Sequence, residues 1–435
     1  MLDIQNSSRP FVRQEAGRIS SRIPELDGIR AVAILLVIGC HYEGFCRGLG
    51  LVPSVGWIGV DIFFVLSGFL ITSILLELRG TESPFRTFYV RRVLRILPIY
   101  YATVLVVSCL SLLNHEHQVN LRNLISRVFL LQSLVHAPEL MNRAYQALFH
   151  AGPHPALLLR SPLPPAMDGF PCGPWAYTLG VAWSLSVEEY FYAFWAPVVL
   201  LFRKTSAITV SAILIVAGSI TVQYLGFSGY TDYFNFPCKM NTVMAGALLA
   251  LYMQWRRKRS GIRKTLDRWA VVLGAASFVL FLLVLLWNRP ILGRELRDSP
   301  SFMVVGVPSI SILFFLSIGW VIDRSGGDQH VLRLLRLRPL RQLGTVSYSL
   351  YLFHVPVYQA IQLCTGTCGS NRMVLQWTVS IASLIVSIFL ALMSWKYIES
   401  PILKLKDRWA PAPGSARSFR LISEKHDTPT ARDFR

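Results

Sequence analysis

The sequence lacks the residue patterns that build most metal sites in proteins. Its seven cysteines are scattered, and no two of them form a C-x-x-C pair of the kind that zinc sites commonly use. Five histidines gather between residues 114 and 182, but they have no cysteine partners at ligand spacing. A solvated loop is therefore favoured over a metal site for His115, His117, His136, His150 and His154. We expect no bound metal.

Acidic residues are also scarce, with 24 Asp and Glu against 43 Lys and Arg, which gives a net charge of +19. No basic face with interleaved aromatic residues is present, so we expect no nucleic-acid partner. Instead, 32 of the basic residues lie before Arg30 or in alternate connecting segments and the C-terminal segment, and apart from Arg30 only 10 lie elsewhere. This alternation follows the positive-inside rule and predicts that both termini are cytoplasmic.

Internal repeats are absent, whereas long apolar runs are frequent. The chain of 435 residues is 53% apolar, with a mean hydropathy of +0.46, which is typical of a multi-pass membrane protein. We expect an all-α transmembrane helix bundle with about ten spans. These are residues 28–46, 57–77, 96–113, 183–202, 207–225, 237–254, 269–287, 302–322, 345–363 and 375–395, of which the second, with its aspartate, is the least clear-cut.

Three regions follow from this pattern. Residues 1–25 are expected to form a basic cytoplasmic segment that is not a cleavable signal peptide. Residues 26–405 form the transmembrane domain, with a long extracytoplasmic loop at 114–182. Residues 406–435, rich in Pro, Ala, Ser and charge, are expected to form a disordered cytoplasmic tail.

The first apolar run contains two ionisable residues, Arg30 and His41, separated by ten uncharged residues. Eleven helical steps make about three turns plus roughly 20°, so both side chains share one face, about 16 Å apart along the axis. Such residues in a span usually face a wet cavity, where Arg30 would hold an anion and His41 would accept a proton. The alternative is that both extend to the membrane interfaces. Asp27, three residues earlier, either pairs with Arg30 or serves as a helix N-terminal acid.

A second cluster, FYVRRVLRILPIYY at 88–101, places Arg92 and Arg95 on one helical face. Two planar guanidiniums suit phosphate groups, because each offers bidentate donors. The alternative is a topology anchor of the positive-inside kind.

A third cluster, WSLSVEEYFYAFW at 183–195, begins an apolar helix with the adjacent carboxylates of Glu188 and Glu189. One of them could orient His41 or bind the hydroxyls of an acceptor. The alternative is a capping box, because Ser186 and Glu189 match the S-x-x-E pattern.

Two further segments carry polar residues in apolar surroundings. In GWIGVDIFFVLSGFLIT, at 56–72, Gly59, Ser67 and Gly68 permit close helix approach, and Asp61 is ionisable. In SYSLYLFHVPVY, at 347–358, a packing role is favoured over a catalytic one for His354. Cys364 and Cys368 at a helix end and Cys172 in the long loop permit an extracytoplasmic disulfide whose pairing stays open.

Together, in this order and spacing, these motifs resemble the acyltransferase 3 family of integral-membrane acyltransferases. The resemblance runs from Pro24 to about Leu405 and includes ELDGIRAVAILLVIGCHY and the closing YIESP at 397–401. The family's arginine–histidine motif maps onto Arg30 and His41, and its paired arginines onto Arg92 and Arg95. Its serine-glycine-phenylalanine motif maps onto Ser67, Gly68 and Phe69. Its acidic motif maps onto Glu188 and Glu189, with Tyr190 where glutamine is common.

The resemblance implies an enzyme of the bacterial inner membrane that moves an acyl group, by default acetyl, from cytosolic acyl-CoA to a hydroxyl of a carbohydrate or glycolipid. No bound cofactor is expected, since acyl-CoA is a co-substrate and its thioester is already activated. We expect His41 to act as general base or to carry a transient acyl group. The expected catalytic group is His41, Arg30, Asp27, Glu188 and Glu189. The expected donor-binding group is Arg92, Arg95, Ser67, Gly68 and Phe69.

The leading alternative from a different class of protein is a proton-coupled transporter of a sugar or anion. Such a transporter would also use buried His, Asp, Glu and Arg side chains. It predicts internal repeats and paired broken helices, and neither is visible in the sequence.

Overall fold

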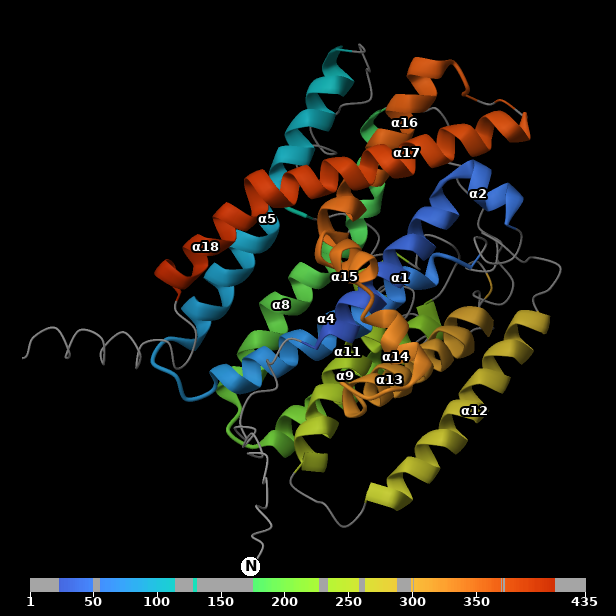
Figure 1. Ribbon diagram of the computed structural model, residues 1–435. Helices are drawn as coiled ribbons and strands as arrows, with labels where there is room; N and C mark the ends of the chain where they lie inside the picture. The colour runs from blue at the N-terminus through green and yellow to red at the C-terminus, as the bar shows by residue number, and fades with distance from the viewer. Residues whose placement is uncertain are drawn as a thin grey trace, which may run out of the picture.

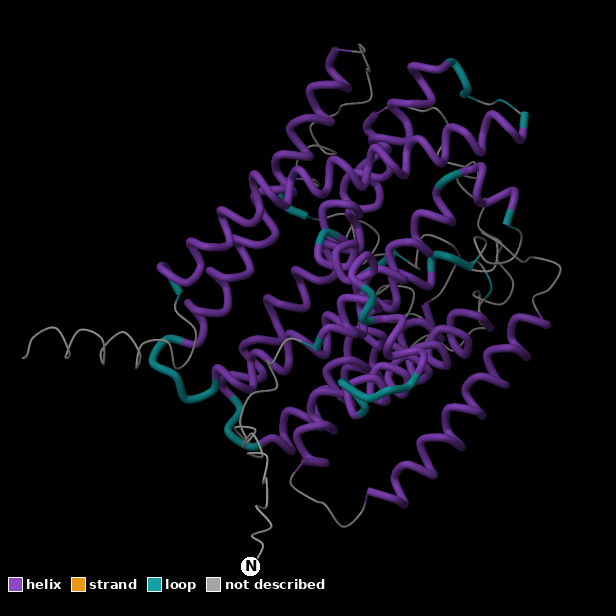
Figure 2. The backbone as a smooth tube through the Cα atoms, in the orientation of Figure 1, coloured by secondary structure: helices purple, strands orange, loops and turns teal. Residues whose placement is uncertain are grey.

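The computed structural model describes residues 23–49, 55–113, 128–130, 175–226, 234–257, 263–287, 299, 301–368, 370 and 372–410. Within these residues every regular element is a helix, as the sequence predicts, and no strand occurs (Figure 2). The histidines of the long loop and residues 411–435 lie outside the described residues, so the predictions about them stay predictions.

Each of the ten predicted spans overlaps helical residues, although the first of them covers two helices, α1 and α2. In chain order the helices are α1 (Pro24–His41), α2 (Glu43–Gly48), α4 (Ile58–Leu78), α5 (Pro84–Leu113), η3 (Trp175–Ala182), α8 (Trp183–Leu201), α9 (Thr205–Gly226), α11 (Phe236–Arg257), α12 (Arg263–Trp287), η7 (Phe302–Gly306), α13 (Val307–Asp323), α14 (His330–Leu335), α15 (Arg338–Thr345), α16 (Ser347–Thr365), α17 (Met373–Ser394), η8 (Trp395–Glu399) and α18 (Ser400–Trp409).

Six helical segments in the described part of the chain are long and apolar enough to cross a membrane. They are Ile58–Leu78, Pro84–Leu113, Thr205–Leu225, Ala270–Trp287, Phe302–Asp323 and Met373–Lys406. The other four predicted spans, α1, α8, α11 and α16, are helices that are less apolar because they carry the charged and polar residues of the interior. The protein is therefore a multi-pass membrane helix bundle, while ten crossings and cytoplasmic termini stay predictions.

Helix α1 lies at the centre of the bundle, between α4, α14, α15 and α16, whereas α12 lies at its edge (Figure 1). Because α12 lies at the edge, much of its apolar surface is exposed, as in a helix that faces lipid. Helices α1 and α4 are mostly buried and form the core.

Helices α4 and α11 pack with their backbones in direct contact. A Cβ added at Gly68 would overlap the carbonyl oxygen of Val243, and one at Gly246 would overlap that of Val65. Likewise, a Cβ at Gly59 would overlap the carbonyl oxygen of Ala33 in α1. The close helix approach predicted at Gly59 and Gly68 is confirmed, and it fixes Ser67 beside the interior of the bundle.

The first predicted span, 28–46, is wrong as a single helix. Helix α1 ends at His41, Tyr42 is extended (φ −92°, ψ 117°), and α2 begins at Glu43. Side chains of neighbouring helices satisfy the backbone donors released at this break: Glu43 N donates to Tyr358 Oη (3.0 Å) and Gly44 N to Ser380 Oγ (3.2 Å). The break is stable within the bundle because these donors keep partners.

The end of α16 carries the cysteine pair noted in the sequence. Thr365 is followed by Gly366 in the left-handed region (φ 62°), which ends the helix in the usual way. Cys368 is disulfide-bonded, whereas Cys364 is free, and Cys172 lies outside the described residues.

Candidate active site

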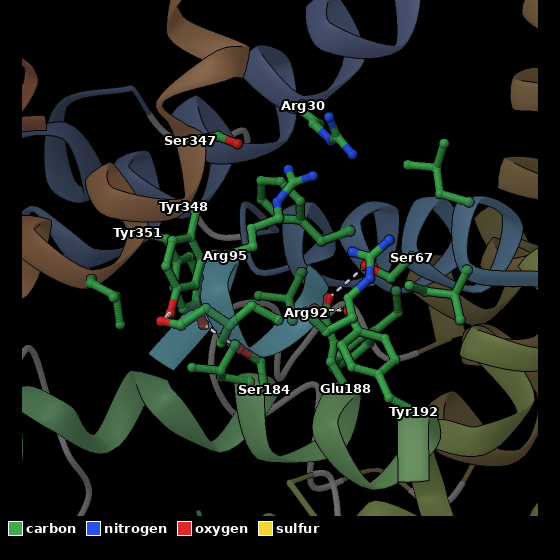
Figure 3. A pocket seen from close by; sticks show the side chains of 18 residues that line it. Arg30, Ser67, Arg92, Arg95, Ser184, Glu188, Tyr192, Ser347, Tyr348 and Tyr351 are labelled. Atoms are coloured by element: carbon green, nitrogen blue, oxygen red, sulfur yellow. Dashed lines mark hydrogen bonds between the residues drawn. The ribbon is translucent and has the colours of Figure 1, made fainter. Parts of the chain in front are cut away.

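A cavity of about 110 Å³ opens between α1, α4, α5, α8 and α16 (Figure 3). Its polar lining comes from all five helices, and apolar side chains complete the wall. The lining residues are Arg30, Val60, Phe63, Phe64, Ser67, Leu70, Ile71, Arg92, Arg95, Ile96, Ser184, Leu185, Glu188, Tyr192, Ser347, Tyr348, Tyr351 and Leu352. Arg30, Ser67, Arg92, Arg95 and Glu188, five of the predicted site residues, thus meet in one place.

The cavity is dominated by positive charge. Three guanidiniums enter it, Arg30 from α1 and Arg92 and Arg95 from α5, above Glu188 of α8 in Figure 3. Among the described residues that line the cavity, Glu188 is the one carboxylate. A site with three cations and one anion is electrostatically complementary to a polyanionic ligand.

Arg30 is held by Asp27, one helical turn earlier, with Nη1 3.3 Å from Oδ1. The predicted pairing of these residues is confirmed. Asp27 is also in the first turn of α1, so the macrodipole favours its negative charge there as well. Pairing fixes the guanidinium at the cavity wall but leaves other N–H groups of Arg30 available for a ligand.

Arg92 and Arg95 lie on the same face of α5, as their spacing predicts. The guanidinium carbon of Arg92 lies 5.7 Å from the ring centre of Tyr192 and 5.9 Å from that of Phe88, within the range of cation–π contacts. Arg95 is exposed while it lines the cavity, so it marks the mouth, and Arg92 lies further in.

Glu188 accepts two hydrogen bonds that fix its carboxylate. Ser67 Oγ donates to Oε1 (2.7 Å), and Tyr192 Oη donates to Oε2 (2.8 Å). Ser67 therefore contributes to the site by orienting a carboxylate. Gly68 lies in the α4–α11 contact and Phe69 in the core, with 1% of its surface exposed, so neither is among the lining residues.

The capping-box interpretation of Ser186 and Glu189 is wrong. The 3₁₀ helix η3 leads directly into α8 at Trp183, so Ser186 lies inside the helix and its Oγ donates to Trp183 O (2.7 Å). Glu189 is not among the residues lining the cavity. Its buried Oε1 has no hydrogen-bond partner among the described residues.

His41 occupies the last position of α1, at the opposite end of that helix from Arg30. Its Nδ1 lies 2.8 Å from Nε2 of His354, whose own Nδ1 lies 2.7 Å from the carbonyl oxygen of Tyr351. The Tyr351 side chain lines the cavity, whereas His41 does not. His41 is thus connected to the cavity wall through two residues of α16.

The contribution of α16 is larger than the sequence analysis assigned. One helical face of α16 carries residues at positions i, i+4 and i+7, namely Ser347, Tyr351 and His354. This spacing could have predicted their shared role from the sequence. Tyr192, four residues after Glu188, is a second site residue that sequence reasoning missed, and its i, i+4 spacing is informative in the same way.

No group of three His, Cys, Asp or Glu side chains within the described ranges has the geometry to hold a metal ion. The arrangement of arginines, a fixed carboxylate and a histidine pair suits anion binding and proton transfer at a reacting group.

Comparison with known proteins identifies the family. The acyltransferase domain of the acyltransferase 3 family matches residues 23–396. The chain belongs to this family. The match includes every residue of the candidate site, from Asp27 to His354.

Several proteins named as O-acetyltransferases are similar to the chain over most of its length. One is "Putative peptidoglycan O-acetyltransferase YrhL" of Bacillus subtilis, 30% identical over 399 residues, covering 87% of this chain and 55% of that protein. Peptidoglycan O-acetyltransferase OatA of Listeria monocytogenes is 27% identical over 399 residues, covering 88% and 56%. O-acetyltransferase OatA of Staphylococcus aureus is 25% identical over 415 residues, covering 91% and 60%.

The chain therefore spans between 55% and 60% of the lengths of these relatives. No solved structure matches it significantly.

Proposed function

We propose that the protein is a membrane O-acyltransferase that moves an acetyl group from acetyl-CoA to a hydroxyl of a cell-envelope carbohydrate or glycolipid. The observation that carries this proposal is the convergence of Arg30, Arg92 and Arg95 on one cavity of a protein that belongs to an acyltransferase family. Family membership favours acyl transfer over the proton-coupled transporter.

The donor fits the charge of the cavity. Coenzyme A carries phosphate groups at one end of a long arm and the thioester at the other. Arg95 at the mouth and Arg92 behind it would bind the phosphates through bidentate, charge-assisted hydrogen bonds. Arg30, held by Asp27, would bind a further anionic or carbonyl oxygen deeper in the cavity. The arm would extend along α1, whose Arg30 and His41 are about 16 Å apart along the helix axis.

The chemical step assigned to His41 is general-base catalysis. His41 takes the proton of the acceptor hydroxyl as its oxygen attacks the thioester carbonyl carbon. A C–O bond forms, the C–S bond breaks, and the coenzyme leaves as a thiolate that takes up the proton. An acyl-histidine intermediate would use the same residue as nucleophile, with transfer to the hydroxyl as a second step.

The class of acceptor is proposed from the relatives. Two of the three are named for peptidoglycan, a carbohydrate polymer outside the bacterial inner membrane, and we place this protein in that membrane. The long segment 114–182 is expected to lie on the same side as the acceptor. Glu188, whose carboxylate is fixed by Ser67 and Tyr192, is suited to bind an acceptor hydroxyl or an arginine of the donor site.

The test uses the full chain in lipid nanodiscs with acetyl-CoA labelled in the acetyl group, and peptidoglycan fragments as acceptors. We expect release of the free CoA thiol, together with glycan that gains one acetyl mass and contains the label. Hydrolysis without labelled glycan would contradict the acceptor class. Folded protein that neither binds acetyl-CoA nor releases thiol would overturn the acyltransferase proposal itself.

A further inference from the structure

A continuous chain of hydrogen bonds links His41 to the backbone of α16. His41 Nδ1 lies 2.8 Å from His354 Nε2, and His354 Nδ1 lies 2.7 Å from the carbonyl oxygen of Tyr351. The two imidazole rings have centroids 5.0 Å apart and an angle of 31° between their planes. His354 is fully buried, whereas His41 is partly exposed.

The direction of both hydrogen bonds follows from the carbonyl oxygen of Tyr351, the acceptor at the end of the chain. A carbonyl oxygen can only accept, so the proton between His354 and Tyr351 lies on His354 Nδ1. A neutral imidazole has one N–H, so His354 Nε2 presents a lone pair. That lone pair must accept from Nδ1–H of His41. The neutral His41 ring therefore has its proton on Nδ1 and its lone pair on Nε2.

The end of α1 is anchored to the same part of α16 by a second contact. Tyr42, directly after His41, donates from Oη to the carbonyl oxygen of His354 (3.1 Å), and its Oη also lies 3.1 Å from Ser387 Oγ. Because Tyr42 is buried and extended, the break in the helix sets the direction in which His41 leaves the helix end. The position of the His41 ring is therefore determined jointly by its own hydrogen bond and by its neighbour.

We infer that His354 is a positioning residue that holds His41 in the Nδ1–H tautomer and so makes Nε2 the basic atom. This inference rests on the proposed function, in which His41 is the base. During transfer the hydroxyl proton would move to His41 Nε2, and Nδ1–H of the resulting imidazolium would still donate to His354. The hydrogen bond would strengthen with the charge on its donor, which favours the protonated state.

The test compares two substitutions of His354 that differ in one property. In His354→Gln the amide oxygen is the same number of bonds from Cβ as Nε2, so it can still accept from His41. His354→Leu has similar bulk and no acceptor. We expect His354→Leu to lower kcat by at least about tenfold, within the range of lost general-base function, with little change in the KM for acetyl-CoA. His354→Gln should keep most of the wild-type kcat.

A spectroscopic measurement separates positioning from packing. Nitrogen-15 chemical shifts of labelled histidine distinguish Nδ1–H from Nε2–H rings, and comparison with the His41→Gln spectrum assigns the signal. We expect the Nδ1–H tautomer in the wild type and in His354→Gln. An Nε2–H tautomer of His41 in the wild type would overturn the inference. That tautomer is the one expected if His354 were doubly protonated and donated to His41. A His354→Leu protein that folds and keeps its kcat would also overturn the inference.

These results are distinguishable from failure of the proposed function. If His41→Gln remains active, the base assignment fails whatever His354 does. The tautomer is measured without turnover, so it tests the hydrogen-bond chain independently of the reaction. If His354→Leu does not fold, the wild-type and His354→Gln spectra still decide between the two tautomers.

Discussion

Lys239 of α11 and Asp61 of α4 form a fully enclosed ion pair, with Nζ 3.1 Å from Oδ1 and side-chain exposures of 0% and 1%. The pair lies in the α4–α11 interface, where Gly68 and Gly246 each let the two backbones come into direct contact. Charges removed from water to this degree persist in proteins when they are paired.

Removing one member of this pair should therefore destabilise the protein more than removing both. We expect Lys239→Met alone to cost about 3–5 kcal/mol of unfolding free energy, because it leaves the aspartate charge buried. The double variant Lys239→Met/Asp61→Leu should recover much of that loss. Unfolding in detergent, followed by circular dichroism, checks both. Equal losses in the single and double variants would contradict the interpretation.

Arg92→Ala and Arg95→Ala should each raise the KM for acyl-CoA by roughly one to two orders of magnitude. The reason is that a hydrogen bond to a charged group contributes about 1.5–3 kcal/mol. The matched control is Arg91→Ala on the same helix, whose Nε donates to Ala410 O (2.7 Å) outside the cavity. Steady-state kinetics against acyl-CoA concentration measure the effect. An equal rise in the KM of Arg91→Ala would contradict a donor-binding role and favour the alternative, in which the arginine cluster is a topology anchor.

His41→Gln should lower kcat by about 10²–10⁴-fold while acyl-CoA binding stays close to wild type. Glutamine keeps a hydrogen-bonding group but cannot take the proton. Turnover at saturating donor and acceptor, with binding measured by calorimetry, provides the two readouts. The assignment of His41 as the base would be falsified if the folded variant turned over at a near wild-type rate.

The orientation in the membrane can be tested at two exposed, described positions. The charge alternation predicts that Glu82, between α4 and α5, is cytoplasmic and that Met373, at the start of α17, is extracytoplasmic. The disulfide at Cys368 agrees with an oxidising environment for the second position. A membrane-impermeant thiol reagent should label Met373→Cys in intact cells more strongly than the wild type, which already has the free Cys364, whereas Glu82→Cys should add no labelling. The reverse pattern would contradict the predicted topology.

Glu25, ahead of the first predicted span, provides a pH-dependent contribution to stability. Burial alone would raise its pKa, but hydrogen bonds from the Gly326 N–H and the Ser325 hydroxyl and the nearby Arg336 together lower it. A lowered pKa means that the charged form stabilises the fold above the ordinary glutamate pKa, and that this stabilisation disappears as the pH falls through the folded-state value.

Glu25→Gln should therefore have a lower melting temperature than the wild type at pH 7, with the gap closing below about pH 4, near the reference glutamate pKa. Thermal unfolding of both proteins from pH 7 down to pH 3 checks this. A gap that is independent of pH would show that the carboxylate charge contributes nothing.

Most of the architecture was predictable because hydrophobic runs and charge placement are local signals. The helices and the pairing of Asp27 with Arg30 agree with the sequence analysis. Arg92 and Ser67, which it grouped together, line one cavity, but Glu188, which it placed in a separate group, lines the same cavity. Tyr192, which lies four residues after Glu188 on the same helix, could have been predicted from the same local signals.

The parts that were not predictable depend on partners far away in the chain. The break at Tyr42 is stabilised by Tyr358 and Ser380, more than 300 residues later, and no local feature of the first span reveals it. His41 and His354 are 313 positions apart, so their hydrogen bond follows only from the packing of α1 against α16. The capping-box alternative at Ser186 and Glu189 failed because η3 continues straight into α8 at Trp183, which places Ser186 inside the helix.

The break after His41 means that α17 helps to position the proposed base from outside the cavity. Ser380 and Ser387 lie seven residues apart, on one face of α17, and both are fully buried. Their hydroxyls bind Gly44 N and Tyr42 Oη, on the short stretch that follows His41, while none of the described cavity-lining residues belongs to α17. In a genetic screen, loss of either serine would produce the phenotype of an active-site mutant from a helix that looks like lipid-facing scaffold.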